Sequence, residues 1–212
     1  MATVCVYCSS SESIEAGFLA LAAEVGERIG RGGHQLVSGG GRVSMMGAVA
    51  SEARRHGAHT VGVIPQHLMA QEVADTDADE LLVVDTMRER KAVMDAHADV
   101  FVVLPGGIGT LEEFFEVWTA GSLGMHPKPV IVLDHDGFYR PLWVFLESLI
   151  QRGFVRATAY QQLHRVSDVA GAFEVIDALQ PDRPHRRAPT LDAGPEQARE
   201  PASGTDPQTR AG

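Results

Sequence analysis

The sequence has little cysteine, the residue that forms disulfides and many structural metal sites. It has two cysteines among 212 residues, Cys5 and Cys8, which form a C-x-x-C spacing. A structural zinc site takes about four ligands, and there is no further cysteine to supply them. Cys5 lies inside a predicted strand, which disfavours redox chemistry as well. The histidines have no H-E-x-x-H or other close ligand spacing, so we predict no metal site and no cofactor.

Long apolar runs and an excess of positive charge are also missing. No apolar stretch reaches the length that spans a bilayer, and residues 1–10 lack the basic start and long apolar region of a secretory signal. The net charge is -10, whereas sequence-independent nucleic-acid binding needs a basic surface. We therefore expect a cytoplasmic protein whose partners include neither a membrane nor a nucleic acid.

The sequence does contain a regular alternation of apolar strands and amphipathic helices. The patterns predict strands over residues 3–7, 35–38, 59–64, 81–84, 100–104 and 130–133, and helices over residues 12–29, 139–150 and 169–179. Three further helices are predicted: one that follows the glycine-rich residues 39–47 and ends at residue 56, and two that begin near residues 86 and 110. This alternation predicts the α/β fold class, as a single doubly wound, mostly parallel sheet flanked by helices (Rossmann-like). Ligands of such sheets bind at the carboxyl ends of the strands.

The composition changes from Gln180 onward. Proline, glycine, arginine and acidic residues dominate there, and Leu191 is the only large aliphatic residue. Such a segment cannot bury enough apolar surface to offset the entropy of folding. We predict one domain over residues 1–180 and a disordered tail over residues 181–212.

Three segments next to predicted strand ends could contribute to a site. Residues 39–47 are rich in glycine but lack the Gly-Lys-Ser/Thr ending of a P-loop and the G-x-G-x-x-G spacing, so neither a nucleoside triphosphate nor a dinucleotide is specifically indicated. The hydroxyls of residues 9–11 could cap the following helix or contact a substrate, and capping is the favoured interpretation. Residues 66–80 are acidic and irregular, and we predict a loop over the site.

Residues 100–119, VFVVLPGGIGTLEEFFEVWT, combine a fold signal with a chemical one. An apolar run predicts a buried strand, which Pro105 ends. The glycines at positions 106, 107 and 109 let the backbone turn sharply and approach a ligand, and Thr110 adds a hydroxyl where a helix begins. This arrangement predicts a phosphate cradle.

The helix after the cradle is predicted to have two faces. One face is apolar and the other is mostly acidic: the first holds Leu111, Phe114, Phe115 and Trp118, and the second holds Glu112, Glu113, Glu116 and Thr119. A phosphate at the helix N-terminus would repel Glu113, so the site needs cations. Arg90 offers a planar guanidinium and Lys91 a point charge, both from the preceding helix.

These residues resemble a known family. The run Pro105-Gly106-Gly107-Ile108-Gly109-Thr110-Leu111-Glu112-Glu113 is similar to the Pro-Gly-Gly-x-Gly-Thr-x-x-Glu motif of the Lonely Guy proteins, cytokinin riboside 5′-monophosphate phosphoribohydrolases. The Arg90-Lys91 pair resembles that family's second motif, and the agreement extends over about residues 3–180. The resemblance implies a homodimer that hydrolyses the N-glycosidic bond of cytokinin riboside 5′-monophosphates, and of AMP as a further substrate. The products are the free base and ribose 5-phosphate. Release of the free base activates the cytokinin.

The resemblance also implies roles for single residues. Glu113 would stabilise the positive charge that develops on the ribose and orient or deprotonate water, and Arg90 would hold Glu113 and the ribose in place. The implied substrate-binding residues are Glu72, Lys91, Gly107, Ile108, Gly109, Thr110, Leu111, Glu112 and Thr119. For Glu72 a solvated surface charge is the alternative.

Two other functions compete with this one. A non-catalytic nucleotide or molybdenum-cofactor carrier would need the glycine cradle but not the pair of Glu113 and Arg90, so the presence of the pair favours the enzyme. A lysine decarboxylase would need pyridoxal phosphate on a lysine Schiff base. Neither Lys91 nor Lys128 has surroundings that indicate such a lysine.

Overall fold

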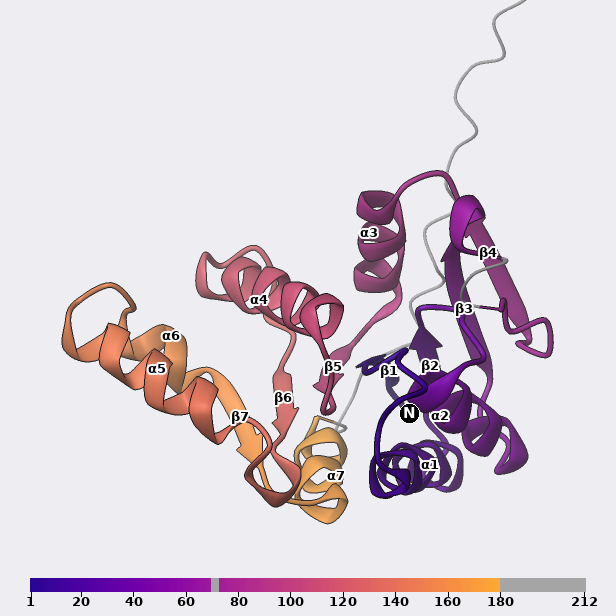
Figure 1. The fold of residues 1–212 in the computed structure, drawn as a ribbon, viewed down its shortest axis with the longest axis horizontal. Helices are drawn as coiled ribbons and strands as arrows, with labels where there is room; N and C mark the ends of the chain where they lie inside the picture. The colour runs from indigo at the N-terminus through magenta and orange to yellow at the C-terminus, as the bar shows by residue number, and fades with distance from the viewer. Residues whose placement is uncertain (70–72, 180–212) are drawn as a thin grey trace, which may run out of the picture.

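The computed structural model describes residues 1–69 and 73–179, which form one seven-stranded sheet between two layers of helices (Figure 1). All strand pairs are parallel, in the order β4-β3-β2-β1-β5-β6-β7. The strands are β1 (Thr3–Tyr7), β2 (Gln35–Ser38), β3 (Thr60–Pro65), β4 (Glu80–Val84), β5 (Val100–Val103), β6 (Val130–Leu133) and β7 (Leu163–Val166). The predicted fold class is confirmed, with a sheet that is parallel throughout.

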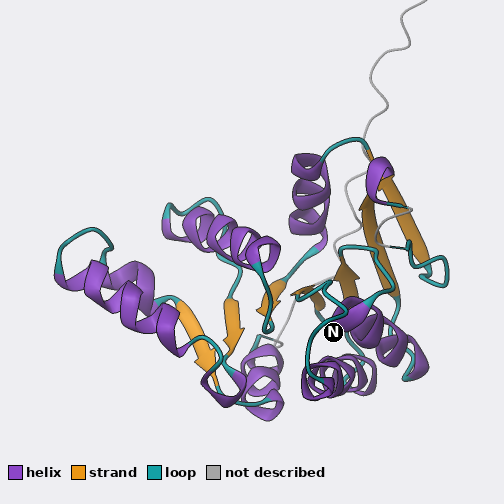
Figure 2. Ribbon diagram, viewed as in Figure 1, coloured by secondary structure: helices purple, strands orange, loops and turns teal. Residues whose placement is uncertain are grey.

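The helices divide between the two faces of the sheet (Figure 2). One face is covered by α1 (Ala16–Arg31), α2 (Ser44–Arg55) and α7 (Val169–Ala178), and the other by α3 (Met87–His97), α4 (Ile108–Ser122), α5 (Arg140–Gln151) and α6 (Ala157–Gln161). Two short 3-10 turns, η1 (Gln66–Leu68) and η2 (His135–Gly137), complete the order of elements. Each face buries its own apolar core, because strands covered on both faces must be apolar on both.

The order of the strands explains where a ligand can bind. From β1 the chain builds the sheet outward through β2, β3 and β4, and then returns to the other side of β1 to add β5, β6 and β7. Tyr7 at the end of β1 pairs with Val103 at the end of β5. The loops that leave these two strands therefore lie next to each other, at the switch point where parallel sheets bind ligands.

Most predicted elements agree with the structure. β1, β2 and β6 have the predicted bounds, whereas α1 begins at Ala16 rather than at residue 12. α6 and β7 were not predicted. None of the helices in the described part of the chain has the length and apolar character that crossing a bilayer requires. Residues 181–212 lie outside the described residues, so the predicted tail stays a prediction.

The two cysteines belong to different layers of the molecule. Cys5 packs into the core beneath α3 and α4, whereas Cys8 packs into the core beneath α1 and α2. Both are buried free thiols, and burial raises the pKa of each well above its usual range. The arrangement disfavours the redox interpretation of the C-x-x-C spacing, because the sheet separates the two side chains and neither is readily ionised.

Candidate functional site

A cavity of about 230 Å³ opens at the carboxyl ends of β1 and β5. Its wall is built from the loop after β1, Gly39 after β2, Met46 of α2, one side of α3 and the first turns of α4. Of the residues predicted to form the site, seven line it: Arg90, Gly107, Ile108, Gly109, Thr110, Glu112 and Glu113. The structure thus brings the two predicted motifs together around one space.

Arg90 is held in a fixed orientation although its charge is almost entirely buried. Arg90 as a whole is only 4% exposed. The Nε–H donates to the Val63 carbonyl at 3.1 Å, and Nη2 donates to the Gly39 carbonyl at 2.7 Å. Because these carbonyls belong to β3 and to the loop after β2, two neighbouring strands set the direction of the guanidinium. The predicted inward orientation of Arg90 is confirmed, and Arg88 on the same helix is exposed.

The start of α4 has the geometry of an anion site. Gly107 is the N-cap residue and provides no side-chain cap, so the first backbone N–H groups of α4 are left for another partner. A Cβ on Gly106 would lie 2.1 Å from the buried Thr110 hydroxyl, so the turn requires glycine there. A Cβ on Gly107 or Gly109 would meet nothing within 4 Å, which leaves open space over the helix end.

Glu113 lies one helical turn further and is half-buried on the cavity wall. It shares that wall with Arg90. Burial is the main cause that raises the pKa of the Cys8 thiol. The nearby charge of Glu113 raises it further, and that of Arg90 lowers it. Cys8 lines the same cavity, so both charges lie near one buried sulfur. A carboxylate and a guanidinium thus converge on one space beside an anion site.

Lys91 has a different position from its neighbour Arg90. Its ammonium group binds Glu112 and lies 2.6 Å from the Glu116 carboxylate. Burial alone would lower the pKa of Lys91, but the hydrogen bonds to these two carboxylates outweigh it and raise the pKa. The lysine therefore joins α3 to α4 and does not line the cavity.

Two other residues that were predicted to bind substrate also lie off the cavity wall. Leu111 packs into the core beside Phe114, and Thr119 is exposed further along α4. Both are absent from the cavity lining. Glu72 lies outside the described residues, so its predicted contact stays untested.

The serines after β1 do not cap α1, so the favoured interpretation of their role was wrong. α1 begins at Ala16 with Glu15 as its N-cap, and no side chain caps it. Ser9 instead accepts a hydrogen bond from the Ser11 backbone N–H at 3.1 Å, and both residues line the cavity. The prediction was wrong because the loop continues for several residues beyond the serines before the helix starts.

One residue that steadies the site has no motif around it. Tyr139, just before α5, is 3% exposed, and its hydroxyl donates to the Leu104 carbonyl at 2.7 Å. Asp134 in turn accepts from the Tyr139 backbone N–H at 2.7 Å. The end of β5, from which the glycine turn departs, is therefore anchored by a residue far along the chain.

Known proteins resemble this chain over most of its length. A family model described as "Possible lysine decarboxylase" matches residues 46–176. A protein from Mycobacterium tuberculosis named cytokinin riboside 5′-monophosphate phosphoribohydrolase is 52% identical over 80% of this chain and 90% of its own length. A rice protein of the same name, with the suffix LOG, is 38% identical over 89% of this chain and 82% of its own length. The chain belongs to the Lonely Guy family.

Solved structures with lower sequence identity share the fold. The molybdenum cofactor binding protein of Rippkaea orientalis superposes with a TM-score of 0.64 at 22% identity, covering 84% of this chain and 96% of that protein. The molybdenum cofactor carrier protein of Chlamydomonas reinhardtii superposes with a TM-score of 0.61 at 24% identity, over 84% and 96% of the two chains. The Rossmann-like sheet is thus common to the Lonely Guy family and to these proteins.

The lysines of this Lonely Guy protein do not suit the chemistry in the description of the family model. A Schiff-base lysine must be neutral and close to the substrate. Lys91 is bound by two carboxylates, and Lys128 lies 2.7 Å from the Asp95 carboxylate. Neither lines the cavity. The positions of both residues therefore disfavour a decarboxylase, in agreement with the sequence.

Proposed function

We propose that this chain hydrolyses the N-glycosidic bond of cytokinin riboside 5′-monophosphates, and of AMP, to the free base and ribose 5-phosphate. The names of the relatives support this substrate class, at up to 52% identity over most of the chain. The observation that carries the proposal is the shared cavity: Arg90, Glu113 and the N-terminus of α4 line the same space. A non-catalytic anion pocket would need only the last of these.

The proposed reaction follows from that arrangement. The 5′-phosphate binds the backbone N–H groups at the start of α4, where the helix dipole favours an anion. This contact places the ribose between Glu113 and Arg90. As the bond between C1′ and N9 breaks, its electron pair leaves with the base and positive charge develops on the sugar, which the Glu113 carboxylate stabilises.

Water completes the reaction. Glu113 orients a water molecule whose oxygen forms the new bond to C1′, and the water proton is released to balance the one that the departing base takes up. Arg90 holds the Glu113 carboxylate and the ribose in position, so that binding energy from the phosphate is used to align the sugar with the carboxylate. Glu72, Lys91, Leu111 and Thr119 are proposed as further substrate contacts on the family resemblance alone, because the last three lie outside the cavity lining.

The apolar part of the cavity suits a substituted base. Met46, Met87 and Met94 contribute side chains from α2 and α3 to the wall. Methionine is flexible and adapts to irregular apolar groups. We assign these residues to the adenine ring and its N6-substituent.

We also propose that the chain forms a homodimer in the cytoplasm. Several large apolar side chains on the layer that contains α4, α5 and α6 are exposed: Leu123, Met125, Val144, Phe145 and Phe154. Exposed apolar groups of this size favour a protein interface. Ile108 at the start of α4 is 89% exposed, so an interface near it would bring the site close to the subunit boundary. Light scattering of the purified protein tests the dimer, and a monomer would contradict it.

The experiment for the proposed function uses AMP and isopentenyladenosine monophosphate. The purified protein is incubated with each nucleotide, and free base and ribose 5-phosphate are measured. We expect both products in equal amounts from the isopentenyl substrate. If calorimetry detects nucleotide binding but no ribose 5-phosphate is released, the chain is a carrier and the proposal fails.

A further inference from the structure

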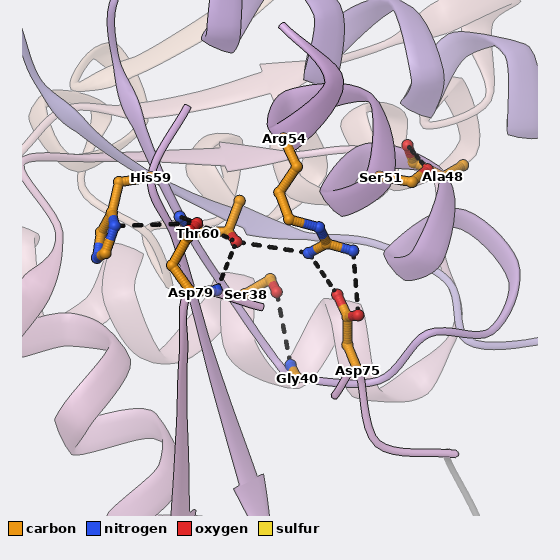
Figure 3. Close-up of polar contacts among 9 residues, drawn as sticks. All are labelled: Ser38, Gly40, Ala48, Ser51, Arg54, His59, Thr60, Asp75 and Asp79. Atoms are coloured by element: carbon orange, nitrogen blue, oxygen red, sulfur yellow. Dashed lines mark hydrogen bonds and ion pairs between the residues drawn. The ribbon is translucent and has the colours of Figure 1, made fainter. Parts of the chain in front are cut away.

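An ion pair between the half-buried Arg54 and the buried Asp75 lies beside Gly40 (Figure 3). Arg54, near the end of α2, holds both carboxylate oxygens of Asp75: Nη1 donates to Oδ2 at 2.8 Å and Nη2 donates to Oδ1 at 3.1 Å. Asp75 is 4% exposed. A two-pronged guanidinium–carboxylate pair fixes orientation as well as distance. The backbone at residue 75 is therefore held firmly against α2.

The start of β3 reinforces this pair. Arg54 Nη1 also approaches the Thr60 hydroxyl, at 3.4 Å, and that hydroxyl donates to the Asp79 carboxylate at 3.0 Å. The Thr60 backbone N–H donates to the same carboxylate at 2.8 Å. Figure 3 shows these groups as one connected set of polar contacts. The segment before β4 is thus attached to α2 through Asp75 and to β3 through Asp79.

The clamped segment, residues 73–79, in turn holds the glycine loop after β2. The Asp75 backbone N–H donates to the Gly40 carbonyl at 2.8 Å, and the Arg42 N–H donates to the Val73 carbonyl at 3.0 Å. Gly40 has a positive φ of 75°, and a Cβ there would lie 3.0 Å from the Val63 backbone nitrogen. The loop therefore lies close against β3 on one side and is hydrogen-bonded to the clamped segment on the other.

The carbonyl of the preceding residue, Gly39, accepts the 2.7 Å hydrogen bond from Arg90. The chain of contacts thus runs from Arg54 through Asp75, Gly40 and Gly39 to the guanidinium in the cavity. Arg54 and Asp75 do not line that cavity. We propose that Arg54 and Asp75 are positioning residues for Arg90 in the reaction, an inference that rests on the proposed function for its catalytic consequence.

An ion pair that served stability alone would predict something different. Buried pairs often contribute little net stability, because desolvation of the two charges offsets their attraction. A purely structural pair would change the melting temperature and leave the folded enzyme unaltered. A positioning pair changes the behaviour of Arg90 in the folded protein, and its effect on rate depends on the presence of Arg90.

The test is a double-mutant cycle on turnover. Asp75→Asn keeps the size of the side chain and the backbone N–H that reaches Gly40, but removes the charge. We expect a kcat about tenfold lower than wild type, and no further loss when the same change is made in an Arg90→Ala background. Glu52→Gln is the matched control, because Glu52 lies on α2 and pairs with Arg55 without touching the loop. Equal losses from Asp75→Asn in both backgrounds would overturn the inference.

A second measurement separates this inference from the proposed function. The Arg90 Nε–H signal in an NMR spectrum reports the buried bond to Val63 whether or not the protein is an enzyme. Its hydrogen exchange should be at least about tenfold faster in Asp75→Asn and unchanged in Glu52→Gln. Unchanged exchange in Asp75→Asn overturns the positioning role, whereas a wild type that releases no ribose 5-phosphate overturns only the proposed function. If Asp75→Asn does not fold, Arg54→Lys, which keeps the charge and loses the two-pronged geometry, is measured in its place with the same expectations.

Discussion

Replacing Gly39 with alanine should displace Arg90 without unfolding the protein. An alanine Cβ at this position would lie 2.0 Å from Arg90 Nη2, whereas ordinary contact begins near 3.4 Å. The guanidinium nitrogen must therefore move by about 1.4 Å, and a misplacement of roughly 1 Å can cost about 10²-fold in rate. The atoms that give way belong to the end of a flexible side chain, so the backbone can stay in place.

The stability cost of this substitution should be small. It is about that of one hydrogen bond from a charged donor, the one from Nη2 to the Gly39 carbonyl, which is roughly 2 kcal/mol or about 4–8 °C in melting temperature for a chain of this size. Stability is measured by calorimetry and turnover by release of ribose 5-phosphate from isopentenyladenosine monophosphate. We expect kcat to fall by about 10²-fold.

Gly17→Ala is the matched control for this experiment. Gly17 is exposed on α1, and a Cβ there meets nothing within 4 Å. The control should keep wild-type kcat and gain up to about 1 kcal/mol of stability, because alanine favours the helix. A Gly39→Ala protein with wild-type kcat would refute the account of how Arg90 is held. A loss of more than about 10 °C in melting temperature would show that the backbone moves rather than the arginine.

Two further predictions concern buried titratable groups. Burial lowers the pKa of His34, with a partial offset from Asp177, so the stability that depends on a neutral His34 is present above the unfolded pKa of about 6.5 and is lost as the pH falls below it. In urea unfolding from pH 7.5 to 5, the free energy of unfolding should therefore depend less on pH in His34→Gln than in wild type. The same pH dependence in both proteins would contradict this. Burial raises the pKa of Cys5 and Cys8, so iodoacetamide at pH 8 should label neither thiol in the native protein and both in urea, as mass spectrometry would detect. Rapid native labelling would restore the redox interpretation.

The sequence was informative where a local pattern had one structural solution. Apolar runs gave β1 and β6 with their observed bounds, because a strand covered on both faces is mostly apolar. β7 has no such run: His164 and Arg165 are exposed on an edge strand, and only two of its four residues are apolar. Short edge strands lack the signal that identifies central ones.

The site was predictable only in part for a related reason. Motifs identified Arg90, Glu113 and the glycine turn, because glycines and charges at fixed spacing have a specific chemistry. The contact between Arg90 and Gly39 joins residues 51 apart in sequence, and no local pattern encodes it. Asp75 resembled the other acids of a solvated loop, and only its burial against Arg54 distinguishes it.

In the proposed reaction Glu113 stabilises the charge that develops on the sugar, and the turnover of a Glu113→Gln variant tests this role. The kcat for ribose 5-phosphate release from isopentenyladenosine monophosphate is measured for wild type, Glu113→Gln and Glu174→Gln, the last a control at an exposed position of α7. The account predicts a loss of about 10²-fold or more in Glu113→Gln and none in the control, with both proteins folded. A Glu113→Gln enzyme that turns over at the wild-type rate would contradict it.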